Sequence, residues 1–350
     1  MYLDTAATKF FINQPIWMSC MAEALKGVGN PSSLHSAGEK ARKLIETARK
    51  RIALSINAKP EQILFFPSAT AANHAVSLYA PWNTSGIEHS SMDFTNNLVP
   101  NISHILISNI TGELYDIKSI RDKCEGLFHT DASAAYSKTE IDVQALNVDF
   151  MTFPSSHKLG LMGGCCPLYV KDVQKFTSSI SKLFKGGEQE GGVSRGTENV
   201  LAIHAYGVYA SNIPYEIRRN KTYNNNINKW IDEELSYYHK KGENFVIRGR
   251  FKEDTFSSIG DSNIALLAFK NVDAETLQYL LSEKHDIQVS TLSACSSGSI
   301  DGRIINRLSV PVVYQYGTIR VSWDYEYKRG DVIEALKKII SVGEHLSKMN

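Results

Sequence analysis

The stretch ILFFPSATAANHA (residues 63–75) begins with four apolar residues, continues through a turn of small residues and ends in the start of a helical pattern. A run of bulky apolar residues bounded by small ones is typical of a short strand. Helical patterns lie between several further runs of this kind, which are HILIS (104–108), GLFHTD (126–131), VDFMTF (148–153) and CPLYV (166–170). Strands that alternate with helices predict an α/β fold in which functional residues follow the carboxyl ends of parallel strands.

A long surface helix is predicted over residues 34–56, where apolar residues recur at spacings of three and four and the opposite face is charged. Ser32 or Ser33 would be its N-cap. The polar, Asn-rich segment 212–241 is expected to form a helical link into a second set of elements. That set comprises strands at 263–269, 287–292 and 318–323 and a helix at 331–346.

Length and composition limit the class of protein. A chain of 350 residues with 43% hydrophobic residues can form one large and one smaller domain. Its 38 basic and 37 acidic side chains nearly cancel, so direct binding of nucleic acid is not expected.

The cysteines and the first residues of the chain indicate a cellular compartment. The five cysteines are odd in number and contain no CxxC spacing, which argues against a disulfide framework and against a metal site. The first residues lack a basic segment followed by an apolar run, and no apolar stretch of about 18 residues occurs. We therefore expect a cytoplasmic protein with no membrane partner and no metal.

The motif SSHK (155–158) follows the predicted strand VDFMTF directly. A lysine at a strand end between apolar segments is placed to lose its shell of water, which an imine-forming amine requires. A surface lysine that happens to follow a strand is the ordinary alternative for Lys158.

Two more features have a chemical and an ordinary interpretation. Asp131 ends a predicted strand, where its carboxylate could pair with a protonated pyridine nitrogen, or could instead cap a helix. Residues 67–75 offer backbone N–H groups and the Thr70 hydroxyl to a phosphate at a helix start, although many helix starts have this composition.

Ten motifs, taken in order along the chain, resemble the landmarks of NifS-type cysteine desulfurases in the class V aminotransferase group of pyridoxal-phosphate enzymes. The motifs are YLDTAAT (2–8), GNPSSLHSAG (29–38), ATAAN (69–73), EH (88–89), HTDAS (129–133), SSHK (155–158), GGEQEGG (186–192), RGTENV (195–200), LSACSSGS (292–299) and TIRVS (318–322).

The resemblance implies the fold-type I architecture of pyridoxal-phosphate transferases. In this architecture a large domain has a mixed, mainly parallel sheet flanked by helices, and a smaller domain is α+β. The resemblance assigns residues 12–212 to the large cofactor-binding domain. It assigns residues 1–11 and 213–350 to the small domain, which carries the catalytic cysteine loop.

The resemblance also implies the residues that bind pyridoxal 5'-phosphate. Lys158 would carry the cofactor covalently, His89 would stack on the pyridine face and Asp131 would hold the ring nitrogen. Without the family context, His89 would be interpreted as an ordinary core histidine. The phosphate would be bound by residues of the strand-end and helix-start motifs, namely Ala69, Thr70, Ser155 and His157.

Three further residues complete the implied site. Thr197 would reach the phosphate of the neighbouring subunit, which makes a homodimer part of the mechanism. Asn109 would lie near the cofactor ring oxygen and the substrate. Arg320 would bind the carboxylate of the L-cysteine substrate, a task that suits the fork of a guanidinium group.

Cys295 would make the protein a desulfurase. It lies in ACSSGS, a segment of small polar residues after a predicted strand, as a mobile nucleophile requires. Its thiolate would take sulfur from L-cysteine as a persulfide, with His89 as the proton acceptor for the substrate thiol, and pass it to an acceptor protein whose identity the sequence does not reveal. Cys165 and Cys166, beside a predicted strand, are expected to be packed thiols.

The chain departs from the family pattern in three places. Ala134 stands where the family usually has a glutamine that donates to the ring oxygen. After Lys158 the chain has LGLMGGCC (159–166) in place of a Gly-Pro-Lys-Gly turn. The segment between His89 and Asn109 is shorter than usual, which suggests that a strand and a helix have been trimmed.

Other functions share much of this pattern. Selenocysteine lyases and other class V members share the lysine, aspartate and arginine, so the cofactor is predicted more firmly than the substrate. A degenerate scaffold that keeps the fold and only binds a partner is the alternative from a different class. Retention of the five residues Lys158, Asp131, His89, Arg320 and Cys295 argues against a scaffold.

Overall fold

The computed structural model describes residues 1–92, 99–241, 262–291 and 312–349. The chain divides into two compact units. Unit 1 comprises Met1–Phe10, Ile107–Leu114 and Arg218–Asn350, and unit 2 comprises Phe11–Leu106 and Tyr115–Ile217.

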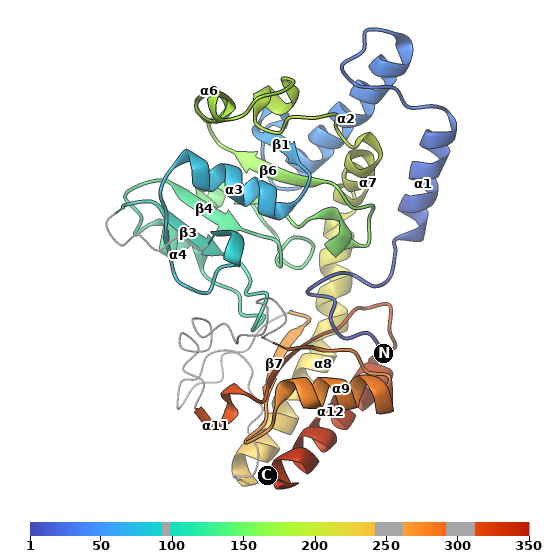
Figure 1. Cartoon of the computed structure of the whole chain (residues 1–350), viewed down its shortest axis with the longest axis vertical. Helices are drawn as coiled ribbons and strands as arrows, with labels where there is room; N and C mark the ends of the chain where they lie inside the picture. The colour runs from blue at the N-terminus through green and yellow to red at the C-terminus, as the bar shows by residue number, and fades with distance from the viewer. Residues whose placement is uncertain (93–98, 242–261, 292–311, 350) are drawn as a thin grey trace. The chain divides into compact units, whose positions relative to one another are not determined.

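Unit 2 contains a six-stranded sheet in the order β1-β6-β5-β4-β3-β2. Figure 1 labels β1, β6, β4 and β3 of this sheet. Strands β2, β3, β4 and β5 run parallel to one another, whereas β6 is antiparallel to both β1 and β5. The strands are β1 (Ile63–Phe66), β2 (Asn83–Thr84), β3 (Ile102–Ile105), β4 (Phe128–Asp131), β5 (Phe150–Thr152) and β6 (Cys166–Val170). The predicted α/β class, with a mixed and mainly parallel sheet flanked by helices, is confirmed.

The helices of unit 2 occupy the connections between the strands and the two ends of the unit. The α-helices are α1 (Gln14–Leu25), α2 (Ser36–Leu54), α3 (Ala69–Tyr79), α4 (Ile117–Arg121), α5 (Val143–Leu146), α6 (Val173–Ile180) and α7 (Val200–Ala210). Short 3-10 turns are η1 (Pro60–Gln62), η2 (Ser90–Met92), η3 (Ser156–Leu159), η4 (Ser181–Leu183) and η5 (Gln189–Gly192).

Helix α2 begins at Ser36, later than the sequence predicts, and His35 is its N-cap. The His35 ring accepts a hydrogen bond from the backbone N–H of Gly38 at 3.3 Å. The prediction of Ser32 or Ser33 as the cap is wrong. These serines lie in a turn that precedes the helix, where the Ser33 carbonyl accepts from the guanidinium group of Arg42 at 2.6 Å.

Helices α2 and α7 pack together because a glycine permits a close approach. A Cβ atom added to Gly207 of α7 would lie 2.4 Å from the Cα atom of Ala48 in α2. Any larger residue at position 207 would force these two helices apart.

Unit 1 is built on an antiparallel sheet in the order β7-β9-β8. Its elements are β7 (Ile264–Ala268), α9 (Ala274–His285), β8 (Ser290–Thr291), α11 (Val312–Gln315), β9 (Thr318–Ser322) and α12 (Arg329–Met349). The N-terminal segment joins this sheet through isolated bridges from Tyr2 to Gln288 and from Asp4 to Ser322.

The polar, Asn-rich segment is helical, as predicted, and forms α8 (Ile213–Lys241). Its inward-facing positions in unit 1 include Tyr223, Ile227 and Ile231, which are spaced by four residues and belong to the buried core of the unit. This spacing places one apolar stripe on the core side of an otherwise polar helix.

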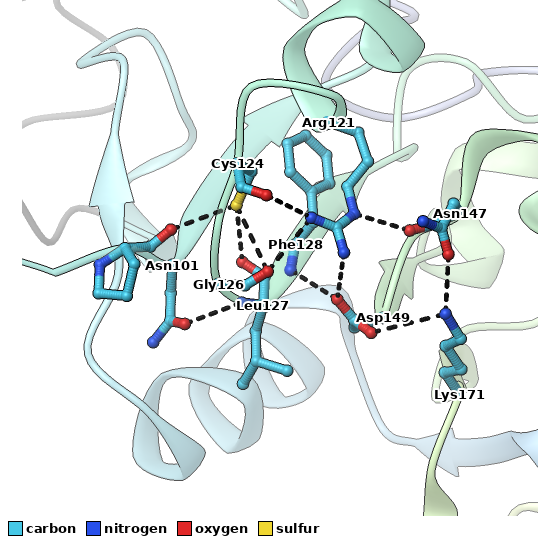
Figure 2. Close-up of polar contacts among 10 residues, drawn as sticks. Asn101, Arg121, Cys124, Gly126, Leu127, Phe128, Asn147, Asp149 and Lys171 are labelled. Atoms are coloured by element: carbon cyan, nitrogen blue, oxygen red, sulfur yellow. Dashed lines mark hydrogen bonds and ion pairs between the residues drawn. The ribbon is translucent and has the colours of Figure 1, made fainter.

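A polar network joins the amino ends of β4 and β5 (Figure 2). Arg121 donates from Nε to the carbonyl of Asn147 at 2.8 Å and from Nη1 to the carbonyl of Cys124 at 2.9 Å. Asp149 accepts from the backbone N–H of Phe128 at 2.9 Å and lies 3.6 Å from Nη2 of Arg121. The network therefore ties the loops at this edge of the sheet, and the carboxyl ends of the same strands carry the candidate site.

Among the helices of the described residues, none combines the length and the apolar character needed to span a bilayer.

Candidate active site

Asp131 is the last residue of β4 and is buried, with 6% of its surface exposed. Its Oδ1 accepts from the backbone N–H of Ser133 at 2.8 Å, and its Oδ2 accepts from the side-chain amide of Asn73 at 3.2 Å. Within the described part of the chain this carboxylate forms no ion pair. A buried anion without a cation is costly, so a protonated pyridine nitrogen fits this position.

Lys158 lies in η3, which follows β5, and its side chain is half-buried. The charges of Lys158 and Asp131 both act on His89: the positive charge lowers the pKa of the histidine and the negative charge raises it. The structure therefore brings Lys158, Asp131 and His89 into one electrostatic environment at the carboxyl ends of the strands.

His89 is exposed rather than a core residue. Its pKa is lowered, chiefly because the surrounding protein removes water from the ring, with Asp131 opposing this effect and Lys158 adding to it. Nδ1 of the ring lies 2.8 Å from the Ser91 hydroxyl.

Two of the predicted phosphate-binding residues, Ala69 and Ser155, are in contact at the start of α3. Ser68 caps this helix, and the backbone N–H of Ala69 donates to the Ser155 hydroxyl at 2.8 Å. Thr70 follows Ala69 in the sequence, His157 lies two residues after Ser155, and both are exposed. The first turn of α3 carries no acidic residue, so the positive end of the helix is available to an anion. These groups fit a phosphate.

Thr197 is exposed in the loop between η5 and α7. No hydrogen bond joins it to the other predicted site residues in the part of the chain that the structure describes. The preceding turn is held by the buried carboxylate of Glu190, which binds both terminal nitrogens of Arg49 at 2.9 and 2.8 Å and accepts from the N–H of Phe65. The role of Thr197 toward a partner subunit stays a prediction.

Arg320 and Asn109 belong to unit 1, whereas the residues above belong to unit 2. Arg320 is buried in β9, with Nη2 2.8 Å from Asp4 and Nη1 3.2 Å from the backbone carbonyl of Asn109. Its Nε is buried and has no partner among the described residues. An unsatisfied guanidinium N–H suits a ligand carboxylate.

Sequence reasoning missed two residues of this arrangement. Asp4 pairs with Arg320, and its signal was its place in YLDTAAT (2–8), a motif to which no role was assigned. Asn73 binds Asp131, and its signal was its place in ATAAN (69–73), one helical turn beyond Thr70.

Cys295 lies outside the described residues, and three of the other four cysteines are buried. Burial raises the pKa of Cys20, and it raises the pKa values of Cys165 and Cys166 well above the usual range. The prediction that Cys165 and Cys166 are packed thiols is confirmed. A buried, protonated thiol is a poor nucleophile.

The comparisons with known proteins agree with the site residues described in each unit. The family model described as "Aminotransferase class-V" matches residues 1–101 and 91–336. The chain belongs to the class-V aminotransferase family. The enzymes of this family use pyridoxal phosphate, and the charge of Asp131 and the helix start at Ala69 fit that cofactor.

Two relatives define the similarity more closely. The chain is 26% identical to the cysteine desulfurase IscS of Clostridium botulinum strain Hall, over 99% of this chain and 96% of that protein. It is also 26% identical to a selenocysteine lyase of Xenopus laevis, over 95% of this chain and 91% of that protein.

A solved structure supports the same resemblance. The NifS-like protein from Rickettsia africae ESF-5 is 26% identical, with a TM-score of 0.77 over 97% of this chain and 99% of that one. The predicted resemblance to NifS-type enzymes is therefore confirmed.

Proposed function

We propose that the protein is a pyridoxal-phosphate-dependent cysteine desulfurase that converts L-cysteine to L-alanine and keeps the sulfur on Cys295. The observation that carries the proposal is full-length similarity to a protein named as a cysteine desulfurase, over 99% of this chain. The meeting of Lys158, Asp131 and His89 at the carboxyl ends of the strands supports it.

Each residue would have a defined task. When bound, pyridoxal phosphate supplies an electron sink for the substrate α-carbon. Asp131 holds a positive charge at the ring nitrogen, and Lys158 attaches the cofactor and moves the α-proton at its Nζ atom. Arg320 binds the substrate carboxylate. The backbone carbonyl of Asn109 accepts a hydrogen bond from the guanidinium group of Arg320.

The sulfur step balances without an external oxidant or reductant. The Cys295 thiolate attacks the sulfur of L-cysteine, an S–S bond forms and the Cβ–S bond breaks. The electron pair of the broken bond stays with carbon, which takes a proton and leaves as part of alanine. The products are L-alanine and a persulfide on Cys295.

The proposal includes a second subunit, a sulfur acceptor and a cellular compartment. A homodimer would complete the phosphate site through Thr197 of the second subunit, and a sulfur-acceptor protein would take the persulfide. The cytoplasm, where cysteines stay reduced, is the compartment we propose.

A second candidate reaction is the removal of selenium from selenocysteine, since a relative of equal identity is named selenocysteine lyase. A lyase of that kind needs no protein persulfide.

The degenerate-scaffold alternative predicts no cofactor, whereas the enzyme should be yellow and should lose its colour with borohydride.

The decisive experiment replaces Cys295 with serine and compares the holoenzymes after one turnover with L-cysteine. We expect Cys295→Ser to keep the bound cofactor and to lose most alanine production, because a hydroxyl accepts sulfur far less well than a thiolate. Peptide mass spectrometry of the wild type under non-reducing conditions should find one added sulfur atom on the peptide containing ACSSGS.

Cys124→Ser is the matched control, because Cys124 is the half-buried cysteine among the four described. This variant should turn over normally. Added sulfur at Cys165 or Cys166, or normal turnover by Cys295→Ser, would overturn the desulfurase mechanism and favour a lyase without a protein persulfide.

A further inference from the structure

A chain of side-chain hydrogen bonds connects His89 to Asp131. The His89 Nδ1 atom lies 2.8 Å from the Ser91 hydroxyl, and the backbone N–H of Ser91 also points at Nδ1, at 3.2 Å. The amide nitrogen of Asn73 lies 2.9 Å from the same hydroxyl and 3.2 Å from Oδ2 of Asp131. Two residues outside the predicted site, Ser91 and Asn73, therefore join two residues inside it.

The direction of each hydrogen bond follows from what each group can donate. A carboxylate only accepts, so the group that Asn73 turns toward Asp131 must be its NH2. The second hydrogen of that NH2 points to the Ser91 oxygen, which thereby acts as an acceptor. The hydroxyl hydrogen of Ser91 is then left to donate to Nδ1 of His89.

Burial makes this arrangement of Asn73 specific. The side chain is 1% exposed, and its Oδ1 has no hydrogen-bond partner among the described residues. Turning the amide over would place this oxygen against the Asp131 carboxylate and would leave the NH2 without acceptors. The orientation with the Asn73 NH2 toward Asp131 and Ser91 is therefore the one in which both of these oxygens receive a hydrogen bond.

Two donors therefore converge on Nδ1 of His89, the hydroxyl and the backbone N–H of Ser91. The hydroxyl, at 2.8 Å, is the nearer of the two donors, and the backbone N–H, at 3.2 Å, acts in the same direction. Together they exclude a proton from Nδ1. A neutral imidazole has one proton, which then lies on Nε2. The lowered pKa of His89, caused mainly by loss of water, is consistent with a neutral ring.

We infer that Asn73 and Ser91 are positioning residues that hold neutral His89 in the tautomer with its proton on Nε2. In this tautomer Nε2 donates, and the one nitrogen able to accept a proton is already occupied by Ser91. His89 then serves as a hydrogen-bond donor toward the substrate, in place of the proton acceptor for its thiol that the sequence suggested. Only this chemical consequence rests on the proposed function.

The tautomer is measured directly by nitrogen NMR of the full-length holoprotein labelled with 15N-histidine, without substrate. The His89 signals are identified as those missing from His89→Gln. We expect an unprotonated Nδ1 and a protonated Nε2 in the wild type. Ser91→Ala and Asn73→Ala should both move His89 toward a mixture of tautomers, whereas Ser91→Thr, which keeps a hydroxyl, should restore the wild-type spectrum.

Ser90→Ala is the matched control, since this neighbouring serine is exposed and its change should leave the His89 spectrum as it is. A wild-type proton on Nδ1, or a Ser91→Ala spectrum identical to the wild type, would overturn the inference. The spectrum is independent of turnover, so a failed desulfurase assay with a correct tautomer would count against the proposed function alone.

Discussion

His129 is a fully buried residue of β4 that has no place in the proposed chemistry. Its Nδ1 lies 2.8 Å from the Ser103 hydroxyl and its Nε2 lies 3.0 Å from the Thr152 hydroxyl, on the two neighbouring strands. Loss of water lowers the pKa of this ring to about 4, although the charge of Asp131 acts in the opposite direction. The folded protein therefore keeps His129 neutral.

This histidine predicts an acid-sensitive stability. An unfolded histidine has a pKa of about 6.5, so between that pH and about 4 the unfolded chain binds a proton that the folded chain does not. The free energy of unfolding should fall as the pH drops through this window, by an amount on the order of 3 kcal/mol from this residue. Urea denaturation at a series of pH values measures the loss.

His129→Gln is the comparison, because an amide can still bond to Ser103 and Thr152 and does not titrate. Carboxylates also contribute to the slope, so the difference between the two proteins is the quantity to measure. An equal pH dependence in wild type and variant would contradict the assignment of a neutral, buried His129.

Among the elements, β4 is held at both ends by polar contacts of different kinds. At its carboxyl end Asp131 binds Ser133 and Asn73, while at its amino end the N–H of Phe128 donates to Asp149. Arg121 joins the amino-end network through bonds to the carbonyls of Asn147 and Cys124 (Figure 2). The strand that carries Asp131 is therefore anchored by side-chain contacts at both of its ends.

We predict that Arg121→Ala destabilises the fold by about 2 kcal/mol, because it leaves partly buried carbonyls without their charged donor and removes one of the two cations beside Asp149. Arg121→Lys should recover only part of this loss, since an ammonium group cannot reach several carbonyls in the geometry of the guanidinium fork. Chemical denaturation of the three proteins checks the order of stability.

Lys118→Ala serves as the control on the same helix, because Lys118 forms only an exposed ion pair with Asp122. Its effect should be small. If the two alanine variants lose equal stability, the network of Arg121 has no special part in holding β4 and β5.

At the scale of the whole molecule, the proposed site includes a residue from a second copy of the chain. Thr197 is exposed in its own subunit, and the turn before it is held by the buried pair of Arg49 and Glu190. An exposed hydroxyl on an anchored turn is suited to a phosphate outside its own subunit. The proposed dimer would link cofactor retention to dimerisation.

We predict that the holoprotein sediments as a dimer and that dilution releases subunits and cofactor together. Thr197→Val should retain less cofactor after dialysis because it loses the hydroxyl at nearly constant volume, and Thr197→Ser should retain as much as the wild type. Sedimentation velocity with detection at the cofactor's absorption band checks both. A monomer that keeps its full cofactor would contradict the shared site.

The sequence by itself determined the features that depend on neighbours along the chain. Asp131 at a strand end, Lys158 after β5 and the start of α3 near Thr70 all follow from short apolar runs and their flanking small residues. Burial of Cys165 and Cys166 follows from their place at the start of β6, where Cys165 precedes the strand and Cys166 is its first residue. Local patterns of this kind survive folding because the packing of each element reinforces them.

Only the tertiary structure decided which distant side chains meet. Asn73 binds Asp131 across 58 positions of sequence, and Asp4 binds Arg320 across 316, because the sheets set the neighbours. The N-cap of α2 is His35, because the helix begins at Ser36 and both predicted cap serines lie in the turn before it. A hydrogen bond joins atoms about 3 Å apart, so these contacts form only where strand order and register bring the residues together. The local periodicity of the sequence specifies neither the strand order nor the register.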